Sequence, residues 1–114
     1  MPLDGSLDYI ELPGPDIPAT KRFYGATFGW TFTDYGPDYV GFQSPDGRAG
    51  GFNAELKVAE GGPLVVLYAN DLDSMDAKIV EAGAEIINRH DFPGGRRFHF
   101  RDPNGNEIAV WTKV

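Results

Sequence analysis

The stretch Tyr9–Trp30, YIELPGPDIPATKRFYGATFGW, predicts a strand followed by a helix. The strand is expected at Leu7–Leu12, where polar and apolar residues alternate, and the prolines and glycine that follow interrupt it. The helix is expected at Asp16–Phe28, because its first residue is a favourable N-cap and Pro18 fits the first turn. Apolar side chains recur along it at helical spacing, and Gly29 can end it.

The second half of the chain repeats the order of the first: strand, helix, strand, strand, turn and strand. Further strands of the first half are expected at Trp30–Thr33, Asp38–Gln43 and Arg48–Ala54. Those of the second half are expected at Leu64–Ala69, Ala84–Asn88, Arg96–Arg101 and Glu107–Thr112. A second helix is expected from its cap at Asp71 to Ala82, and the segment His90–Gly95 is expected to be a loop. The repeat predicts an α+β fold of two βαβββ modules, at about residues 5–56 and 63–114 of a single domain.

The composition excludes several classes of protein. A hydrophobic fraction of 41% supports a packed core rather than disorder. No apolar run reaches the ~18–20 residues that span a bilayer, so no membrane partner is expected. The absence of cysteine excludes disulfides, thiolate nucleophiles and cysteine-bound zinc. The net charge of −7 repels phosphate backbones, so we expect no nucleic-acid partner, and without a signal sequence we expect a cytoplasmic protein.

Short motifs along nearly the whole chain carry a resemblance to a known family. They are Tyr9-Ile10-Glu11-Leu12-Pro13 with Asp16, Phe23-Tyr24, Phe28-Gly29-Trp30, Asn70-Asp71, Ala82-Gly83-Ala84 and Asp102-Pro103-Asn104-Gly105-Asn106-Glu107-Ile108. In order and spacing they resemble the vicinal oxygen chelate superfamily, which comprises glyoxalases, bleomycin resistance proteins and dioxygenases. The resemblance implies a curved eight-stranded mixed sheet with both helices on its convex side and a cleft on its open side. It also implies a homodimer, because members commonly build a site from paired modules.

The resemblance further identifies four positions at which metal-dependent members carry histidine or glutamate. They correspond here to Tyr9, Gly51, Leu64 and Ala109. Divalent metals in proteins take imidazole, carboxylate or thiolate ligands, and none of these residues provides one. We therefore predict a site without a metal or other cofactor. Metal-dependent glyoxalase I and extradiol dioxygenase activities are disfavoured.

Strand alternation predicts which side chains line this cleft. If Tyr9 faces it, so does Glu11, while Ile10 and Leu12 pack against the helix. The other side chains expected in the cleft are Tyr39, Gly41, Gln43, Asn53, Leu64, Val66, Tyr68, Arg97, His99, Arg101, Glu107, Ala109 and Trp111. The ligand-binding residues predicted from this set are Tyr9, Tyr39, Asn53, Tyr68, Arg97, Glu107 and Trp111. An aromatic wall with a few polar groups is typical of a small-molecule site.

Two titratable side chains are candidates for catalysis. His99 can act as a general base near neutral pH, with Glu11 orienting or assisting it. Other interpretations stay open: His99 can be a structural histidine on a sheet face, and Glu11 can have a raised pKa or pair with Arg97. Arg97 can clamp a ligand carboxylate or be solvated, Trp111 can stack on a ligand or pack, and His90 is expected on the surface of its loop.

The sequence therefore predicts a small-molecule binding protein with the glyoxalase/bleomycin-resistance fold and no metal site. The acidic balance and the aromatic cleft favour a ligand that is largely aromatic or cationic. One alternative is a metal-independent lyase or isomerase in which Glu11 and His99 transfer a proton. Another is a structural or regulatory module whose cleft is vestigial.

Overall fold

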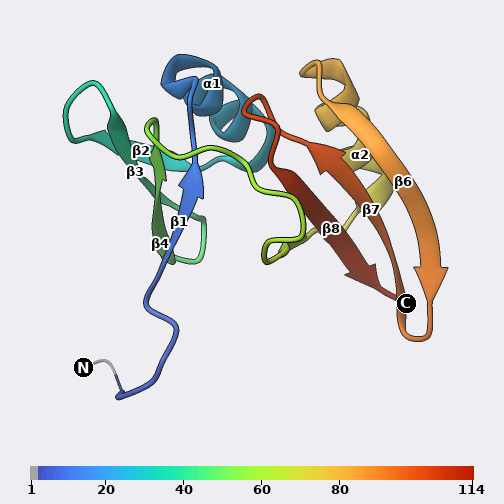
Figure 1. Ribbon diagram of the computed structural model, residues 1–114. Helices are drawn as coiled ribbons and strands as arrows, with labels where there is room; N and C mark the ends of the chain where they lie inside the picture. The colour runs from blue at the N-terminus through green and yellow to red at the C-terminus, as the bar shows by residue number, and fades with distance from the viewer. Residues whose placement is uncertain (1–2) are drawn as a thin grey trace. The chain divides into compact units, whose positions relative to one another are not determined.

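The computed structural model describes residues 3–114, which form two compact units, residues 3–57 and 58–114 (Figure 1). The first unit contains β1 (Tyr9–Pro13), α1 (Ile17–Phe28), β2 (Thr31–Asp34), β3 (Tyr39–Gln43) and β4 (Ala49–Asn53). The second contains β5 (Val65–Tyr68), α2 (Leu72–Glu81), β6 (Glu85–Phe92), β7 (Gly95–Arg101) and β8 (Glu107–Lys113). Within residues 3–114, neither helix is long and apolar enough to cross a membrane.

Each unit contains a four-stranded mixed sheet. The strand orders are β1-β4-β3-β2 and β5-β8-β7-β6, so the two sheets correspond strand by strand. In each, the first strand pairs in parallel with the last, and the other pairs are antiparallel. The predicted α+β fold of two βαβββ modules is thereby confirmed. By hydrogen bonding its eight strands form two four-stranded sheets, one in each unit.

The helix α1 begins and ends as its sequence predicts. The Asp16 side chain accepts a hydrogen bond from the Ala19 amide at 3.0 Å, which satisfies a backbone donor of the first turn. Gly29 ends the helix in the left-handed conformation, with φ of 69°. The buried ring of Tyr24 then stacks on Trp30, with centroids 4.5 Å apart. These contacts confirm that Trp30 is a core residue.

The helix-side faces of both sheets carry the cores, as strand alternation predicts. In the second unit the core contains the following buried side chains: Leu72, Ile79, Phe98, Phe100, Ile108 and Val110. In the first unit Phe52 is fully buried and its ring lies 5.2 Å from that of Tyr24. One expectation for this face is wrong, because Ile10 is 43% exposed. It lies on β1, an outer strand of the sheet, which has a strand neighbour on one side only.

Corresponding turns close the hairpins that the repeat predicts. In the first unit the amide of Gly47 donates to the carbonyl of Ser44 at 2.8 Å, and in the second the amide of Gly105 donates to that of Asp102 at 3.0 Å. Both glycines have positive φ, at 88° and 93°. Side chains other than glycine rarely adopt this conformation, so both turns depend on the residue at this position.

The strand β6 is longer than the sequence predicts. The loop expected at His90–Gly95 is wrong for most of its length, because β6 continues to Phe92 and pairs there with Gly95. The connection is a tight turn at Pro93 and Gly94, in which Gly94 has φ of 97°. His90 therefore lies on a strand, although its exposure agrees with the surface position that was expected.

Ion pairs to α2 hold this long hairpin in place. Arg89 on β6 contacts the Asp76 carboxylate through two nitrogens, at 2.6 and 2.9 Å. Arg96 on β7 contacts Asp73 at 3.4 Å. The carboxylate of Asp71 caps α2 by accepting a hydrogen bond from the Ser74 amide at 3.0 Å. The acidic residues of this helix therefore cap it and also bind the hairpin.

Candidate functional site

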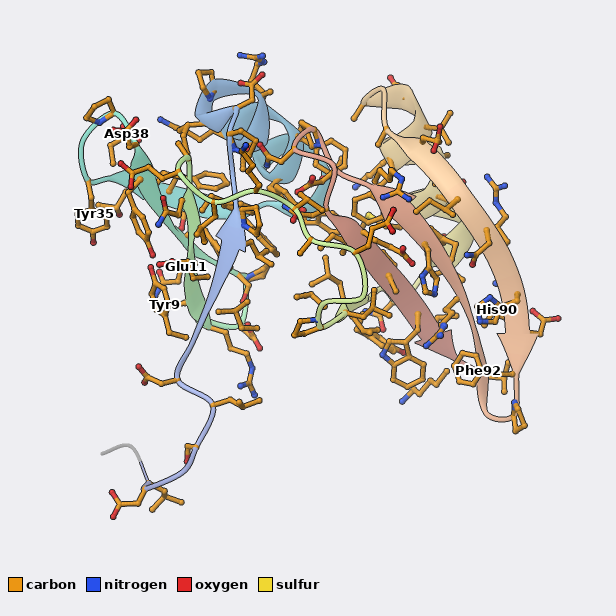
Figure 2. The ribbon with its side chains drawn as sticks, viewed as in Figure 1. Tyr9, Glu11, Tyr35, Asp38, His90 and Phe92 are labelled. Carbon is orange, nitrogen blue, oxygen red and sulfur yellow. The ribbon has the colours of Figure 1, made fainter. Side chains whose placement is uncertain are left out.

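The open face of the first sheet carries a hydrogen-bonded group that we call the tyrosine–glutamate cluster: Tyr9, Glu11, Tyr39 and Asn53. The hydroxyl of Tyr39 donates to Glu11 Oε1 at 2.9 Å and lies 2.7 Å from the hydroxyl of Tyr9. The amide nitrogen of Asn53 donates to Glu11 Oε2 at 3.4 Å. These hydrogen bonds bring the four side chains together on one sheet face, and Figure 2 shows Tyr9 and Glu11 next to each other on β1.

The direction of these bonds follows from the hydrogen atoms available. A hydroxyl has one hydrogen, and that of Tyr39 is used toward Glu11. The bond between the two tyrosines must therefore be donated by Tyr9. The chain of donors runs from Tyr9 through Tyr39 to the carboxylate of Glu11.

Glycine at position 51 makes this arrangement possible. A Cβ atom there would lie 2.1 Å from the hydroxyl oxygen of Tyr39 and 2.5 Å from that of Tyr9. Register places Gly51 next to Glu11 on β1 and opposite Gly41 on β3. The two hydroxyls thus lie directly over the backbone of β4, in space that any larger residue would fill.

The environment of Tyr39 raises the pKa of its hydroxyl. The largest cause is desolvation by burial, and the hydrogen bonds to Tyr9 and Glu11 add to it. Because the folded pKa exceeds the unfolded value of about 10, the neutral hydroxyl contributes stability below that pH. This contribution is lost as pH rises through the folded pKa.

We expect Tyr39 to ionise at a pH well above the ordinary value for tyrosine. Ultraviolet titration of the tyrosinate band in the wild type and in Tyr39→Phe measures this, since the difference between the two curves reports the one hydroxyl. A difference curve with its midpoint near pH 10 would contradict the expectation.

The open face of the second sheet carries a histidine–carboxylate pair. His99 is 6% exposed, and its Nδ1 lies 2.7 Å from Oε2 of Glu107. A carboxylate can only accept, so Nδ1 carries the hydrogen of this contact, and Nε2 has a lone pair whenever the ring is neutral. Among residues 3–114, Nε2 of His99 is buried and has no hydrogen-bond partner. This pairing of imidazole and carboxylate can orient the ring for proton transfer.

Arg97 lies beside this pair and is held by residues of β6. Its Nε donates to Nε2 of His90 at 3.0 Å, and His90 Nδ1 lies 3.3 Å from the side-chain oxygen of Asn88. The guanidinium also lies 6.0 Å from the centre of the Phe92 ring. Sequence reasoning missed Asn88, His90 and Phe92, which alternate along β6 and were assigned in part to a loop.

Three aromatic rings meet at one end of the same face. Tyr68 on β5 packs edge-to-face on Trp111 with centroids 5.1 Å apart, and Phe92 on β6 lies 6.2 Å from the same indole. Tyr68 is 43% exposed. The predicted residues of the second half, namely Tyr68, Arg97, His99, Glu107 and Trp111, therefore share one sheet face. Arg101 instead contacts the backbone carbonyl of Gly105 at 3.4 Å.

Glu11 and Arg97, which the sequence suggested as a possible pair, have different hydrogen-bond partners. Glu11 accepts hydrogen bonds from Tyr39 and Asn53, both in its own unit. Arg97 contacts His90 in the second unit. The two side chains thus each have partners within their own module.

The residues at the four positions that the resemblance identifies include no usual ligand of a divalent metal ion. Tyr9, Gly51, Leu64 and Ala109 offer no imidazole or carboxylate. At Gly51 the space that a ligating side chain would occupy holds two tyrosine hydroxyls. Within residues 3–114, no three His, Cys, Asp or Glu side chains are grouped so that they could hold a metal.

Comparison with known proteins agrees with this fold. The model of the Glyoxalase/Bleomycin resistance protein/Dioxygenase superfamily matches residues 6–110. Anthracycline biosynthesis protein DauV of Streptomyces sp. (strain C5) is 31% identical to this chain over an alignment 130 residues long. The alignment covers 96% of this chain and 47% of that protein. The chain spans about half the length of the curated relatives it matches.

Two solved structures illustrate the likeness. A glyoxalase/bleomycin resistance protein/dioxygenase family enzyme from Burkholderia phytofirmans PsJN superposes with a TM-score of 0.79 at 19% identity, covering 94% of this chain and 98% of that one. TnmS3, an antibiotic binding protein from Streptomyces sp. CB03234, has a TM-score of 0.73 at 22% identity, covering 96% of each chain. These structures share the fold, and the match of the family model over residues 6–110 shows that the chain belongs to the glyoxalase/bleomycin resistance protein/dioxygenase superfamily.

Proposed function

We propose that the chain is a small-molecule binding protein that takes planar aromatic ligands without a bound metal. The observation that carries the proposal is the group of Tyr68, Phe92 and Trp111 on the open face of the second sheet. The opposite face of this sheet already has a complete aromatic and aliphatic core. Aromatic rings beside a few polar groups, here Arg97 and His99, are typical of ligand sites.

The similar proteins support this class of ligand. DauV is named for anthracycline biosynthesis, and TnmS3 is described as an antibiotic binding protein. A metal-free site is supported by the residues at the four family positions, which provide no suitable donor.

The proposal is tested with an anthracycline as the probe, followed by tryptophan fluorescence. We expect quenching that disappears in Trp111→Phe, because the other tryptophan, Trp30, is 7% exposed and stacked between Tyr24 and Phe42. Loss of the stacking ring in Trp111→Ala should weaken binding about tenfold, measured by isothermal titration calorimetry because this variant lacks the reporting indole. Val80→Ala removes an exposed apolar side chain from α2 instead and should leave affinity unchanged.

Two controls decide the outcome. Affinity should be the same with added EDTA and with added zinc, since no metal takes part. Saturable quenching in wild type that persists unchanged in Trp111→Ala would place the ligand elsewhere and overturn the proposal.

A second candidate function is proton transfer by a metal-independent lyase or isomerase. The contact between His99 Nδ1 and Glu107 favours it, because a carboxylate that orients an imidazole leaves Nε2 as the base. Glu11 is the other candidate acid or base. Under this alternative, His99→Gln should abolish conversion of a bound ligand, followed by mass spectrometry, while changing its affinity less than about threefold. Binding that never leads to conversion rejects this alternative.

We also propose that the protein forms a homodimer. Each sheet leaves two outer strands with one unpaired edge, namely β1 and β2 in the first unit and β5 and β6 in the second. The unpaired edge of an outer strand is a template with which another chain can pair. Val66 on β5 is 44% exposed and Tyr68 43%, which provides apolar surface at one such edge. Sedimentation at micromolar concentration tests the proposal, and a monomer at all concentrations contradicts it.

A further inference from the structure

We propose that the tyrosine–glutamate cluster of the first sheet binds the ammonium group of an organic cation. This inference rests on the proposed function in its general form, the binding of small molecules, and it concerns a site within the first unit alone. The cluster can be reached from solvent at Tyr9, which is 46% exposed, and Tyr35, whose ring lies near that of Tyr39, is 66% exposed. Figure 2 shows Tyr35 and Asp38 at the connection of β2 to β3, on the side of the unit where Tyr9 and Glu11 lie.

Glu11 provides a carboxylate without a cationic partner. Both of its oxygens accept hydrogen bonds, but the donors, Tyr39 and Asn53, are neutral. Among the ion pairs found in residues 3–114, none includes Glu11, whereas Lys21 pairs with Asp34 and Arg48 with Asp46. A carboxylate fixed by neutral donors keeps its negative charge available for a ligand.

The tyrosines present acceptors and ring faces rather than hydrogens. Because the hydrogen of Tyr9 points to Tyr39 and that of Tyr39 to Glu11, neither hydroxyl has a hydrogen left to offer a ligand. Tyr9 therefore meets a ligand only through its lone pairs and its ring. The ring of Tyr35 lies 6.4 Å from that of Tyr39 and adds a second aromatic surface. Aromatic rings beside a carboxylate attract an ammonium group through both charge and ring electrons.

The chemistry of the cluster selects an organic cation over a metal ion. Calcium takes about 6–8 oxygen ligands, several of them carboxylates, and the cluster has a single carboxylate. An ammonium group needs only a few acceptors and gains from ring faces. The net charge of −7 also raises the local concentration of cations in general.

The experiment compares benzylammonium with benzyl alcohol, which has the same ring but no charge. Ring signals of 13C-labelled tyrosines, assigned with single Tyr→Phe variants, locate and quantify binding. We expect benzylammonium to shift Tyr9 and Tyr39 but not the buried Tyr24, and to bind about tenfold more tightly than the alcohol. In Glu11→Gln this preference should fall below about twofold.

Asp38→Asn is the matched control, because it removes the same charge from the same unit outside the cluster. The preference should stay at about tenfold there. Equal binding of the two probes in wild type, an unchanged preference in Glu11→Gln, or the same shifts with calcium chloride at equal ionic strength would each overturn the inference. The proposed function is tested separately, by quenching of Trp111 fluorescence, so none of these results contradicts it. If an anthracycline does not quench the wild type while benzylammonium still shifts the tyrosine signals, only the proposed aromatic site is rejected.

Discussion

Replacing Gly50 with alanine is expected to lower the free energy of unfolding by about 3 kcal/mol. A Cβ atom there would lie 2.3 Å from the backbone carbonyl oxygen of Ile10 and 2.3 Å from Cζ of Phe42. Ile10 and Gly50 are register partners in the parallel β1–β4 pair, so this oxygen cannot retreat unless the strands separate. The Phe42 ring is stacked on Trp30 at 4.3 Å, and moving it disturbs the core.

Gly25→Ala is the matched control for this substitution. Gly25 lies inside α1, and the nearest atom to its added Cβ is the carbonyl oxygen of Trp30 at an ordinary 3.9 Å. Alanine in a helix interior is favoured over glycine by roughly 0.5–1 kcal/mol. The same chemical change should therefore stabilise one variant and destabilise the other. Equilibrium urea unfolding followed by circular dichroism measures both, and equal midpoints would contradict the packing argument.

The fold was predictable because its signals are local. Asp16 and Asp71 cap the two helices, and Gly29 ends the first, as the residue types favour. The paired turns at 44–47 and 102–105 have glycine where positive φ is needed. Each of these features depends on a few consecutive residues, and their repetition in both halves indicated two βαβββ modules.

The error at β6 shows where local signals end. Asn88, Arg89, His90 and Asp91 are polar, so this segment lacks the alternation that marks a strand. It is a strand because β7 pairs with it and because Arg89 reaches Asp76 on α2. Asp76 lies 13 residues before Arg89, and β7 lies beyond the turn at Pro93 and Gly94, so neither partner is visible in the polarity of this segment itself.

The candidate site was predictable as a face but not as a set of contacts. Period-two alternation placed Tyr9 with Glu11 and Arg97 with His99 on the open faces. The bond from Tyr39 to Glu11 joins residues 28 apart, and that from Tyr39 to Tyr9 joins residues 30 apart. Only the register of β1, β3 and β4 brings them together, and this register is not encoded in any short motif.

Gly51→Ala is expected to keep the fold but to break the tyrosine–glutamate cluster. The atoms that its Cβ would meet, at 2.1 and 2.5 Å, are the hydroxyl oxygens of Tyr39 and Tyr9, which lie at the ends of rotatable side chains. The tyrosines can therefore move away, and stability should change by less than about 1 kcal/mol, unlike the loss expected at Gly50. When the Tyr39 hydroxyl moves far enough to make room for this Cβ atom, it loses its hydrogen bond to Glu11, which is now 2.9 Å long.

The second sheet has alanine at the position that corresponds to Gly51, so the sheet itself tolerates alanine there. Register pairs Val66 with Ala109 on β5 and β8 as it pairs Glu11 with Gly51 on β1 and β4, so Ala109 occupies the corresponding position. The glycine at 51 is thus required by the two tyrosines above it rather than by the sheet.

Two measurements on Gly51→Ala follow from this difference. The pKa of Tyr39 should fall toward the ordinary value for tyrosine, because the hydroxyl leaves its hydrogen bonds to Tyr9 and Glu11 and becomes more solvated. The preference for benzylammonium over benzyl alcohol should fall from about tenfold to less than about threefold. A variant that unfolds at the wild-type urea concentration, yet keeps both the raised pKa and the preference, would show that the hydroxyls do not lie over Gly51 in solution. The joint loss of both properties in a folded protein would tie the recognition of the cation to Gly51, the position on β4 over which the two tyrosine hydroxyls lie.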